Sequence, residues 1–374
     1  MLEKSDPSTV YFADIAVEAL EPNKTLPAKF KRMLKRFKLK ERVKGRRVGI
    51  KMHFGGNLGY TTIHPIFVRL LVEELKEAGA ARIAAMDNKP QDGLPRGYTP
   101  EILGCEVISC FGTSGKYLHR EDIGFRDFDY AELGGEATDC DFFIDLSHVK
   151  GHGACGFGGA MKNIAMGVVN QPTRRKLHHL EGGITHDPDK CTLCLKCVDN
   201  CPNNAIKFNT DEAGKIVKSK RLVFYHDCTY CQHCILLCPE HALSLDGKHF
   251  HDFAEGMALV SQRFLDKFKP EDTLFINFLL NITILCDCWG LSTAAIVPDI
   301  GILASEDIIA IEHASLDMIK EENLLPNGLP KGRELVDNGG HLFERIHGKD
   351  PYLMVKKLGE KLGMSGEYRI KEVG

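Results

Sequence analysis

The chain has 374 residues, of which 43% are hydrophobic and 26% charged, with a formal net charge of −3. This length allows two or three domains with a full core, and the charge balance does not indicate a polyanionic partner such as nucleic acid. The N-terminus has no apolar signal region, and the longest apolar stretch, residues 273–286, is too short to cross a membrane. Because there are 14 cysteines and no signal peptide, we expect a cytoplasmic protein with metal chemistry, and neither nucleic acid nor a membrane as partner.

Residues 29–47 are rich in lysine and arginine. Phe30, Met33, Leu34 and Phe37 recur at helical spacing within them, which predicts an amphipathic helix with a basic, solvated outer face. A patch for nucleic acid or an acidic partner is the alternative interpretation.

The next residues have the pattern of a parallel β-sheet unit. A strand over 47–53 leads through a glycine-containing loop to a helix that begins at Pro65 and ends at Gly79, and a second strand follows over 81–86. Ligands bind after such strands, so His53 is a candidate catalytic residue. The loop matches no nucleotide-binding motif, and no nucleotide is predicted.

A glycine-rich segment follows a third predicted strand, residues 141–146. It holds five glycines within residues 151–159, and a helix is predicted from about Ala160. Glycine lets the backbone approach a ligand, a helix N-terminus offers free N–H groups, and lysines add positive charge. We therefore expect an anion-binding site with Lys150, His152 and Lys162 as candidate catalytic residues; a flexible loop with a structural turn is the alternative.

Two copies of one cysteine pattern, C-x2-C-x2-C-x3-C-P, follow in residues 191–239. Every cysteine of the second copy lies 37 positions after its counterpart in the first, which indicates internal duplication. The pattern is typical of bacterial ferredoxins with two 4Fe-4S clusters, in which the fourth cysteine of each copy ligates the other cluster. A zinc site would not need a third cysteine in each copy, and a disulfide framework is typical of small secreted domains. The predicted ligands of cluster 1 are Cys191, Cys194, Cys197 and Cys238, and those of cluster 2 are Cys228, Cys231, Cys234 and Cys201.

A further cysteine pair occurs at Cys286-Asp287-Cys288, where the apolar stretch ends. In extended chain both cysteines would point to one side and Asp287 to the other. The two thiols could bind a metal or a substrate, bond to each other, or be buried thiols without a further role. Beyond them, Glu306 and Asp307 begin a predicted helix, and a last helix is expected from about Pro351.

Several of these motifs together resemble the "domain of unknown function 362" family. They are Lys51-x-His53, Lys150-x-His152, residues 158–163 (GGAMKN), Cys286-Asp287-Cys288 and residues 298–301 (PDIG). The resemblance implies an α/β host with an inserted ferredoxin segment and a shared glycine-rich site, but no substrate.

We thus expect an open, mainly parallel α/β host formed by residues 1–182 and 247–374, with an inserted α+β ferredoxin-like module over 183–246. The first functional hypothesis is an iron–sulfur electron-transfer protein or oxidoreductase. Its clusters would receive electrons from a redox partner protein and pass them to a small anionic substrate or a partner site in the host. The alternatives are a metal-binding or metal-delivery protein with structural clusters, in which Cys286 and Cys288 hold an additional metal, and a redox sensor.

Overall fold

The structure is a computed structural model. It describes residues 6–56, 58–201, 205–208, 210–211, 214–215, 222–224, 233–245, 250–290, 292–330 and 334–374.

Eight strands form one open sheet in the order β16-β1-β15-β14-β7-β2-β3-β4. Strand β15 is antiparallel to both neighbours, and the other neighbouring strands pair in parallel. The prediction of an α/β fold with an open, mainly parallel sheet is confirmed. The strands are β1 (Ser8–Asp14), β2 (Arg47–Met52), β3 (Arg82–Asp87), β4 (Glu106–Ser109), β7 (Phe142–His148), β14 (Thr273–Leu279), β15 (Gly301–Ser305) and β16 (Tyr368–Glu372).

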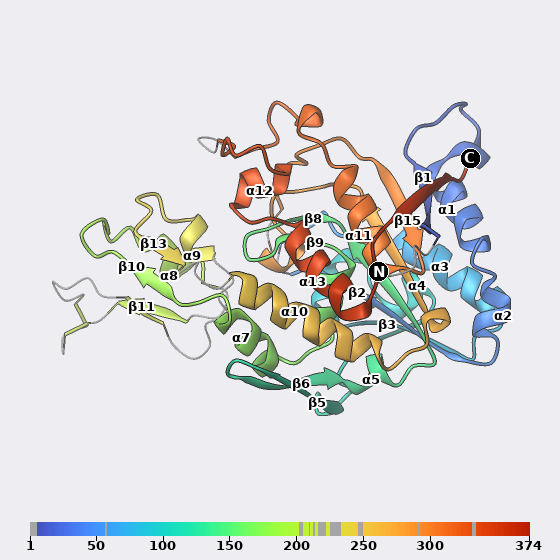
Figure 1. Ribbon diagram of the computed structural model, residues 1–374, viewed down its shortest axis with the longest axis horizontal. Helices are drawn as coiled ribbons and strands as arrows, with labels where there is room; N and C mark the ends of the chain where they lie inside the picture. Colours follow the sequence, from blue (N-terminus) through green and yellow to red (C-terminus); the bar gives the residue numbers. More distant parts are fainter. Residues whose placement is uncertain are drawn as a thin grey trace.

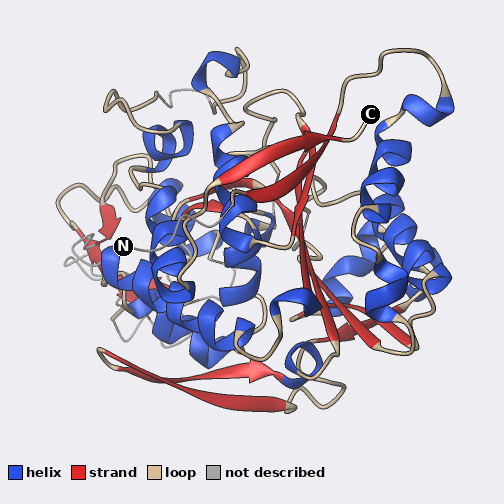
Figure 2. Cartoon of the chain, turned by 45° about the vertical axis from the view of Figure 1, so that its right-hand side comes forward, coloured by secondary structure: helices blue, strands red, loops and turns tan. Residues whose placement is uncertain are grey.

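Helices cover both faces of the sheet, which appears nearly edge-on in Figure 2. Alternate residues of β7 face opposite cores, with Phe142 and Ile144 in one and Phe143 in the other. The first core includes α1 (Leu26–Lys35), α2 (Leu39–Val43), α3 (Pro65–Glu77) and α4 (Pro100–Leu103). The second includes α6 (Ala160–Ala165), α7 (Gln171–His179), α10 (Phe250–Leu265), α11 (Ile308–Asp317), α12 (Leu342–His347) and α13 (Tyr352–Leu362).

Shorter elements connect these layers. They are the hairpin of β5 (Leu118–Phe125) and β6 (Phe128–Gly134), α5 (Gly135–Thr138), the hairpin of β8 (Lys150–His152) and β9 (Gly156–Gly158), and the 3-10 helices η1 (Pro22–Lys24), η2 (Pro90–Arg96), η4 (Pro270–Asp272), η5 (Asp287–Trp289) and η6 (Glu321–Asn323).

The basic helix predicted near the N-terminus is α1, but it ends at Lys35, so Phe37 lies beyond it and α2 follows as a separate helix. The apolar face of α1 packs on α3, where the rings of Phe30 and Phe67 lie 5.7 Å apart in an edge-to-face contact. The prediction that its lysines are solvated does not hold for Lys29, which is buried and pairs with Asp14.

The strands at both ends of the chain and the β5–β6 hairpin were not predicted from the sequence. Strand β16 follows the predicted C-terminal helix, α13, and pairs in parallel with β1. Its residues, Tyr368–Glu372, are mostly exposed, and Tyr368 and Ile370 pack partly buried against the core. Two alternating apolar residues are a weak signal for a strand.

The cysteine-rich segment, residues 183–246, lies beyond the ends of α7 and α10 and projects to one side of the molecule (Figure 1). Its elements are β10 (Ile184–His186), α8 (Lys196–Asp199), β11 (Ile206–Phe208), β12 (Leu222–Phe224), α9 (His233–Leu236) and β13 (Leu243–Leu245). Strands β10 and β13 pair antiparallel and bring the two ends of the segment together. A small core of its own includes Cys197, Ile206, Phe208, Cys234 and Leu243.

Candidate functional site

A cleft opens where β2, β3 and β7 end. This is the carboxyl edge of the parallel strands, where open α/β sheets bind ligands. The four predicted catalytic residues, His53, Lys150, His152 and Lys162, all line the cleft, and so does Cys288. The structure therefore brings together side chains from four separate stretches of the sequence.

A buried polar network supports the floor of this cleft. The Lys51 ammonium donates to Asp87 Oδ1 (3.1 Å), Asn163 Oδ1 (2.9 Å) and the Met52 carbonyl (2.9 Å), which uses all three of its N–H donors. Burial raises the pKa of the Asp87 carboxyl, but the charges of Lys51 and His53 oppose this effect, and the pKa ends below its usual value. Lys51 is therefore a structural residue.

A second buried group holds the loop that carries the cysteine pair. Asp287 accepts a hydrogen bond from His148 Nδ1 (2.9 Å) and lies 3.2 Å from Lys150 Nζ. Burial opposes ionisation of Asp287, but His148 and Lys150 outweigh it and hold its pKa well below the usual value. Lys150 Nζ also donates to the His148 carbonyl (2.6 Å). Lys150 thus fixes the loop as well as lining the cleft.

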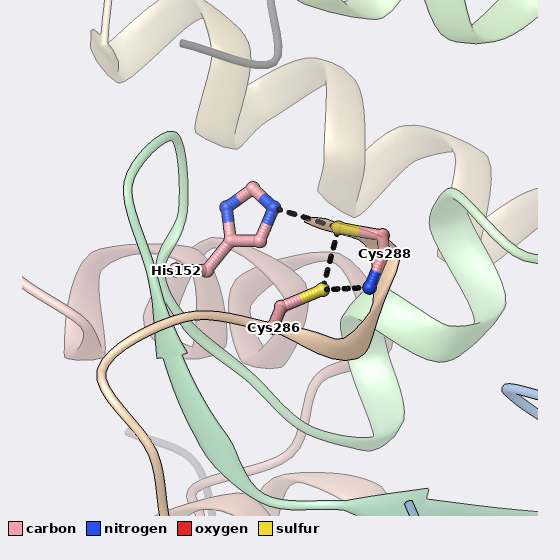
Figure 3. Close-up of side chains that lie close together, drawn as sticks. All are labelled: His152, Cys286 and Cys288. Carbon is pink, nitrogen blue, oxygen red and sulfur yellow. Dashed lines mark hydrogen bonds between the residues drawn. The ribbon is translucent and has the colours of Figure 1, made fainter. Parts of the chain in front are cut away.

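The cysteine pair lies on a tight turn and not on extended chain, which corrects the sequence-based expectation. Strand β14 ends at Leu279, and η5 begins directly after Cys286. The turn still places the two sulfurs together, 2.6 Å apart, with Cys288 Sγ 3.8 Å from His152 Nε2 (Figure 3). The ligand atoms of His152, Cys286 and Cys288 all lie within 4.8 Å of one another, close enough to hold a metal ion.

Charge differs strongly between the two sulfurs. Burial raises the pKa of Cys286, but the hydrogen bond with Cys288 and the charge of Lys162 bring it well below the usual value. The pKa of Cys288 is raised, first by its hydrogen bond with Cys286. Lys162 Nζ donates to Cys286 Sγ over 3.2 Å. Cys286 is therefore the thiolate and Cys288 the thiol of the pair.

The two cleft histidines are held in one tautomer. Gly55 N donates to His53 Nδ1 (2.8 Å), and Ala154 N and Cys155 N donate to His152 Nδ1 (3.1 and 3.2 Å). Because Nδ1 accepts in both rings, the proton of each neutral ring is on Nε2. Burial lowers the pKa of His53, and burial followed by the charge of Lys162 lowers that of His152 to about 4.

The glycine-rich segment forms the buried β8–β9 hairpin in place of an open loop. The expectation that the following helix offers free N–H groups to an anion is wrong at its first residue. Ala160 N donates to Glu312 Oε1 (2.7 Å), so this group already has a protein acceptor. Positive charge at the cleft comes from side chains, including Lys150, Lys162 and Arg174.

In the cysteine-rich segment, Cys191, Cys194, Cys197 and Cys238 line a single pocket. Cys201 does not line it but borders the large cleft, together with Leu237 and Cys288. The same hydrogen bond occurs in each copy of the motif. Ala205 N donates to Cys201 Sγ (3.2 Å) in the first copy, and Ala242 N donates to Cys238 Sγ (3.3 Å) in the second. Cys228 and Cys231 lie outside the described residues.

Sequence reasoning missed Asp145 and Glu312 as acidic partners of the site, and it named Asp287 without giving it a partner. Each is fully or almost fully buried in the structure. Carboxylates within apolar stretches are the signal that could have identified them, since an acidic residue is rarely buried without a partner.

Comparison with protein families gives one match, to the family described as "Domain of unknown function (DUF362)", over residues 48–317. The chain therefore belongs to this family. No curated protein matches it. Within the described residues, none of the helices has the length and apolar character needed to cross a membrane.

Two solved structures share a distant likeness. The lactate racemase apoprotein from Thermoanaerobacterium thermosaccharolyticum is 11% identical, with a TM-score of 0.34 over 67% of this chain and 49% of that one. A protein from Thermotoga maritima is 13% identical, with a TM-score of 0.35 over 70% and 52%. The chain spans about half the length of these proteins.

Proposed function

We propose that this protein is an iron–sulfur electron-transfer protein or oxidoreductase with two 4Fe-4S clusters. Cys191, Cys194, Cys197 and Cys238 would hold one cluster, and Cys201, Cys228, Cys231 and Cys234 the other. Electrons would enter from a redox partner protein and leave at the cleft. Free thiols and clusters of this kind suit the reducing cytoplasm.

The observation that carries the proposal is the composition of the cysteine pocket. Three of its four cysteines belong to the first copy of the motif, and the fourth, Cys238, belongs to the second copy. If each copy held its own cluster, Cys201 would take the place of Cys238. This exchange is the arrangement of two-cluster ferredoxins. The N–H groups of Ala205 and Ala242, which donate to the two exchanged cysteines, are contacts that tune cluster potentials.

The position of Cys201 supports a direction for electron flow. Cys194 is exposed at the first cluster pocket, whereas Cys201 borders the same cleft as Cys288. Cluster 1 would therefore accept electrons from the partner protein, and cluster 2 would deliver them to the cleft.

The charges at the cleft favour a small anionic substrate. Lys150 and Lys162 line its wall, and the His53 ring would present an Nε2–H donor. A carboxylate or phosphate would be bound by such donors.

Anaerobic purification followed by iron, sulfide and EPR analysis tests the proposal. We expect about eight irons and eight sulfides per chain, with the coupled EPR signal of two reduced clusters. Cys238→Ala should lose about half of the iron, and Cys105→Ala, a buried cysteine of the host, should lose none. A protein without reducible iron, or a Cys238→Ala variant with full iron content, would overturn the ligand assignment.

A metal-binding or metal-delivery protein is the second candidate, favoured by the closeness of His152, Cys286 and Cys288. Elemental analysis of the same samples distinguishes the two. A stoichiometric metal other than cluster iron that disappears in Cys286→Ser would favour this second function.

A further inference from the structure

Cys286 and Cys288 form a pair at the wall of the cleft whose sulfurs differ in access. Cys286 is fully buried, whereas Cys288 is exposed. Asp287, which lies between them in the chain, contacts His148 and Lys150, and these contacts hold the turn that carries both sulfurs. A rigid turn that holds two thiols in contact is the geometry needed for reversible bonding between them.

The distances favour a bond between the sulfurs over a shared metal ion. The two sulfurs are 2.6 Å apart. Two thiolates on one tetrahedral zinc, with Zn–S bonds of about 2.3 Å, would lie about 3.8 Å apart. A disulfide needs about 2.05 Å. A small approach forms the disulfide, whereas metal binding requires the pair to open by more than 1 Å on the same estimate.

The hydrogen bonds of His152 point the same way. A histidine that ligates a metal normally donates its other ring N–H to a carboxylate, carbonyl or water. The other nitrogen of His152 instead accepts from two backbone N–H groups, those of Ala154 and Cys155. The ring proton is therefore on Nε2, the atom that faces Cys288 Sγ. His152 is placed to donate a hydrogen bond to the Cys288 sulfur.

We infer that Cys286 and Cys288 are a redox-active dithiol–disulfide pair that collects two electrons at the cleft. Two reduced clusters each supply one electron, the S–S bond breaks, and one proton is taken up. The products are the Cys286 thiolate beside Lys162 and the Cys288 thiol beside His152. Electron delivery through the clusters rests on the proposed function; formation of the pair does not.

This chemistry explains why a one-electron carrier opens onto the cleft. Clusters of this type pass electrons singly, whereas reduction of an organic substrate usually needs a pair. The disulfide couple transfers two electrons. A bond between residues two apart in the chain is geometrically constrained, and constrained disulfides are the more readily reduced ones.

Counting electrons in the intact protein tests the inference. The purified holoprotein is oxidised anaerobically with oxidised glutathione, freed of it, and titrated with reduced methyl viologen. We expect the wild type to take up about four electrons per chain, two in the clusters and two in the disulfide. Cys288→Ser should take up about two, and Cys105→Ala should match the wild type. Peptide mass mapping of alkylated samples locates the disulfide.

Each outcome decides a different point. Uptake of about two electrons by both the wild type and Cys288→Ser would retain the clusters and overturn the redox pair. About two in the wild type and none in Cys288→Ser would retain the pair and overturn the clusters. A metal bound stoichiometrically at the pair, with no disulfide after oxidation, would also overturn the inference.

Lys162→Met gives an independent measure. The Lys162 ammonium stabilises negative charge on the reduced Cys286 sulfur, and stabilising the reduced form makes a disulfide more oxidising. We expect the variant to shift the thiol–disulfide equilibrium with glutathione toward the disulfide by about tenfold or more. An unchanged equilibrium would mean that Lys162 has no redox role.

Discussion

At the scale of single residues, the cleft depends on buried charges that satisfy one another. Lys51 is fully buried and reaches three acceptors, and Asp87 also accepts from Phe54 N (2.9 Å). Breaking such a pair from one side leaves an uncompensated charge in the interior, which costs far more than the loss of an exposed pair.

Asp87→Asn should therefore lower the free energy of unfolding by about 3–5 kcal/mol, measured by urea denaturation. Glu73→Gln, in the exposed Arg69–Glu73 pair (3.1 Å), is the matched control, with an expected loss below about 1 kcal/mol. Equal losses in the two variants would show that the Lys51–Asp87 pair is not needed for stability.

Glu312 should make stability depend on pH. Burial raises its pKa from 4.5 to about 7, so the folded protein keeps a proton that the unfolded chain releases. This contribution is complete below about pH 4.5 and is lost as the pH rises to about 7, a fall of about 3 kcal/mol in the free energy of unfolding.

Glu312→Gln imitates the protonated form and keeps the acceptor for Ala160 N and Asn277 Nδ2. The difference in unfolding free energy between variant and wild type should grow in favour of the variant from pH 5 to pH 7.5. A difference that stays constant with pH would contradict the assignment.

At the scale of elements, the junction between β9 and α6 positions Lys162. The backbone passes so close to Glu312 that a Cβ at Gly159 would overlap its carboxylate oxygen. Gly159 is therefore required by packing, whereas the prediction from sequence was a ligand-binding segment or a flexible loop with a structural turn.

Gly159→Ala should accordingly cost about 1–3 kcal/mol, because the added methyl group must displace Glu312 or the helix. Thermal unfolding followed by circular dichroism measures this cost. Gly183→Ala is the control, since a Cβ there meets nothing within 4 Å, and we expect a change within about 0.5 kcal/mol. Comparable losses at both positions would argue against the close contact.

At the scale of the whole molecule, the host and the cysteine-rich segment have separate cores. The antiparallel pairing of β10 and β13 places the two connections one strand spacing apart, about 4.8 Å. The segment therefore enters and leaves the host at one point, yet its residues 199–201 border the host cleft.

Replacing residues 183–246 by a short Gly-Ser linker should leave a folded host without iron. Because the segment and the host have separate cores, we expect the melting temperature to change by no more than about 2 °C, which corresponds to about 1 kcal/mol for a host of this size. Calorimetry and iron analysis provide the measurements. A host that fails to unfold cooperatively would contradict the division into 1–182 with 247–374 and 183–246.

The sequence by itself determined what depends on local pattern. Periodicity predicted α1 and α3, and apolar runs predicted β2, β3 and β7. The repeated spacing predicted the cysteine ligands of two clusters, which stay a prediction. The tertiary structure decided what depends on distant residues. It ended β14 at Leu279, added β1 and β16 as neighbours, and gave Asp287, Glu312 and Ala160 their partners. These contacts join residues that are far apart in the chain. Whether a buried charge or a sheet edge is stable depends on the element that packs against it, and local sequence does not specify that element.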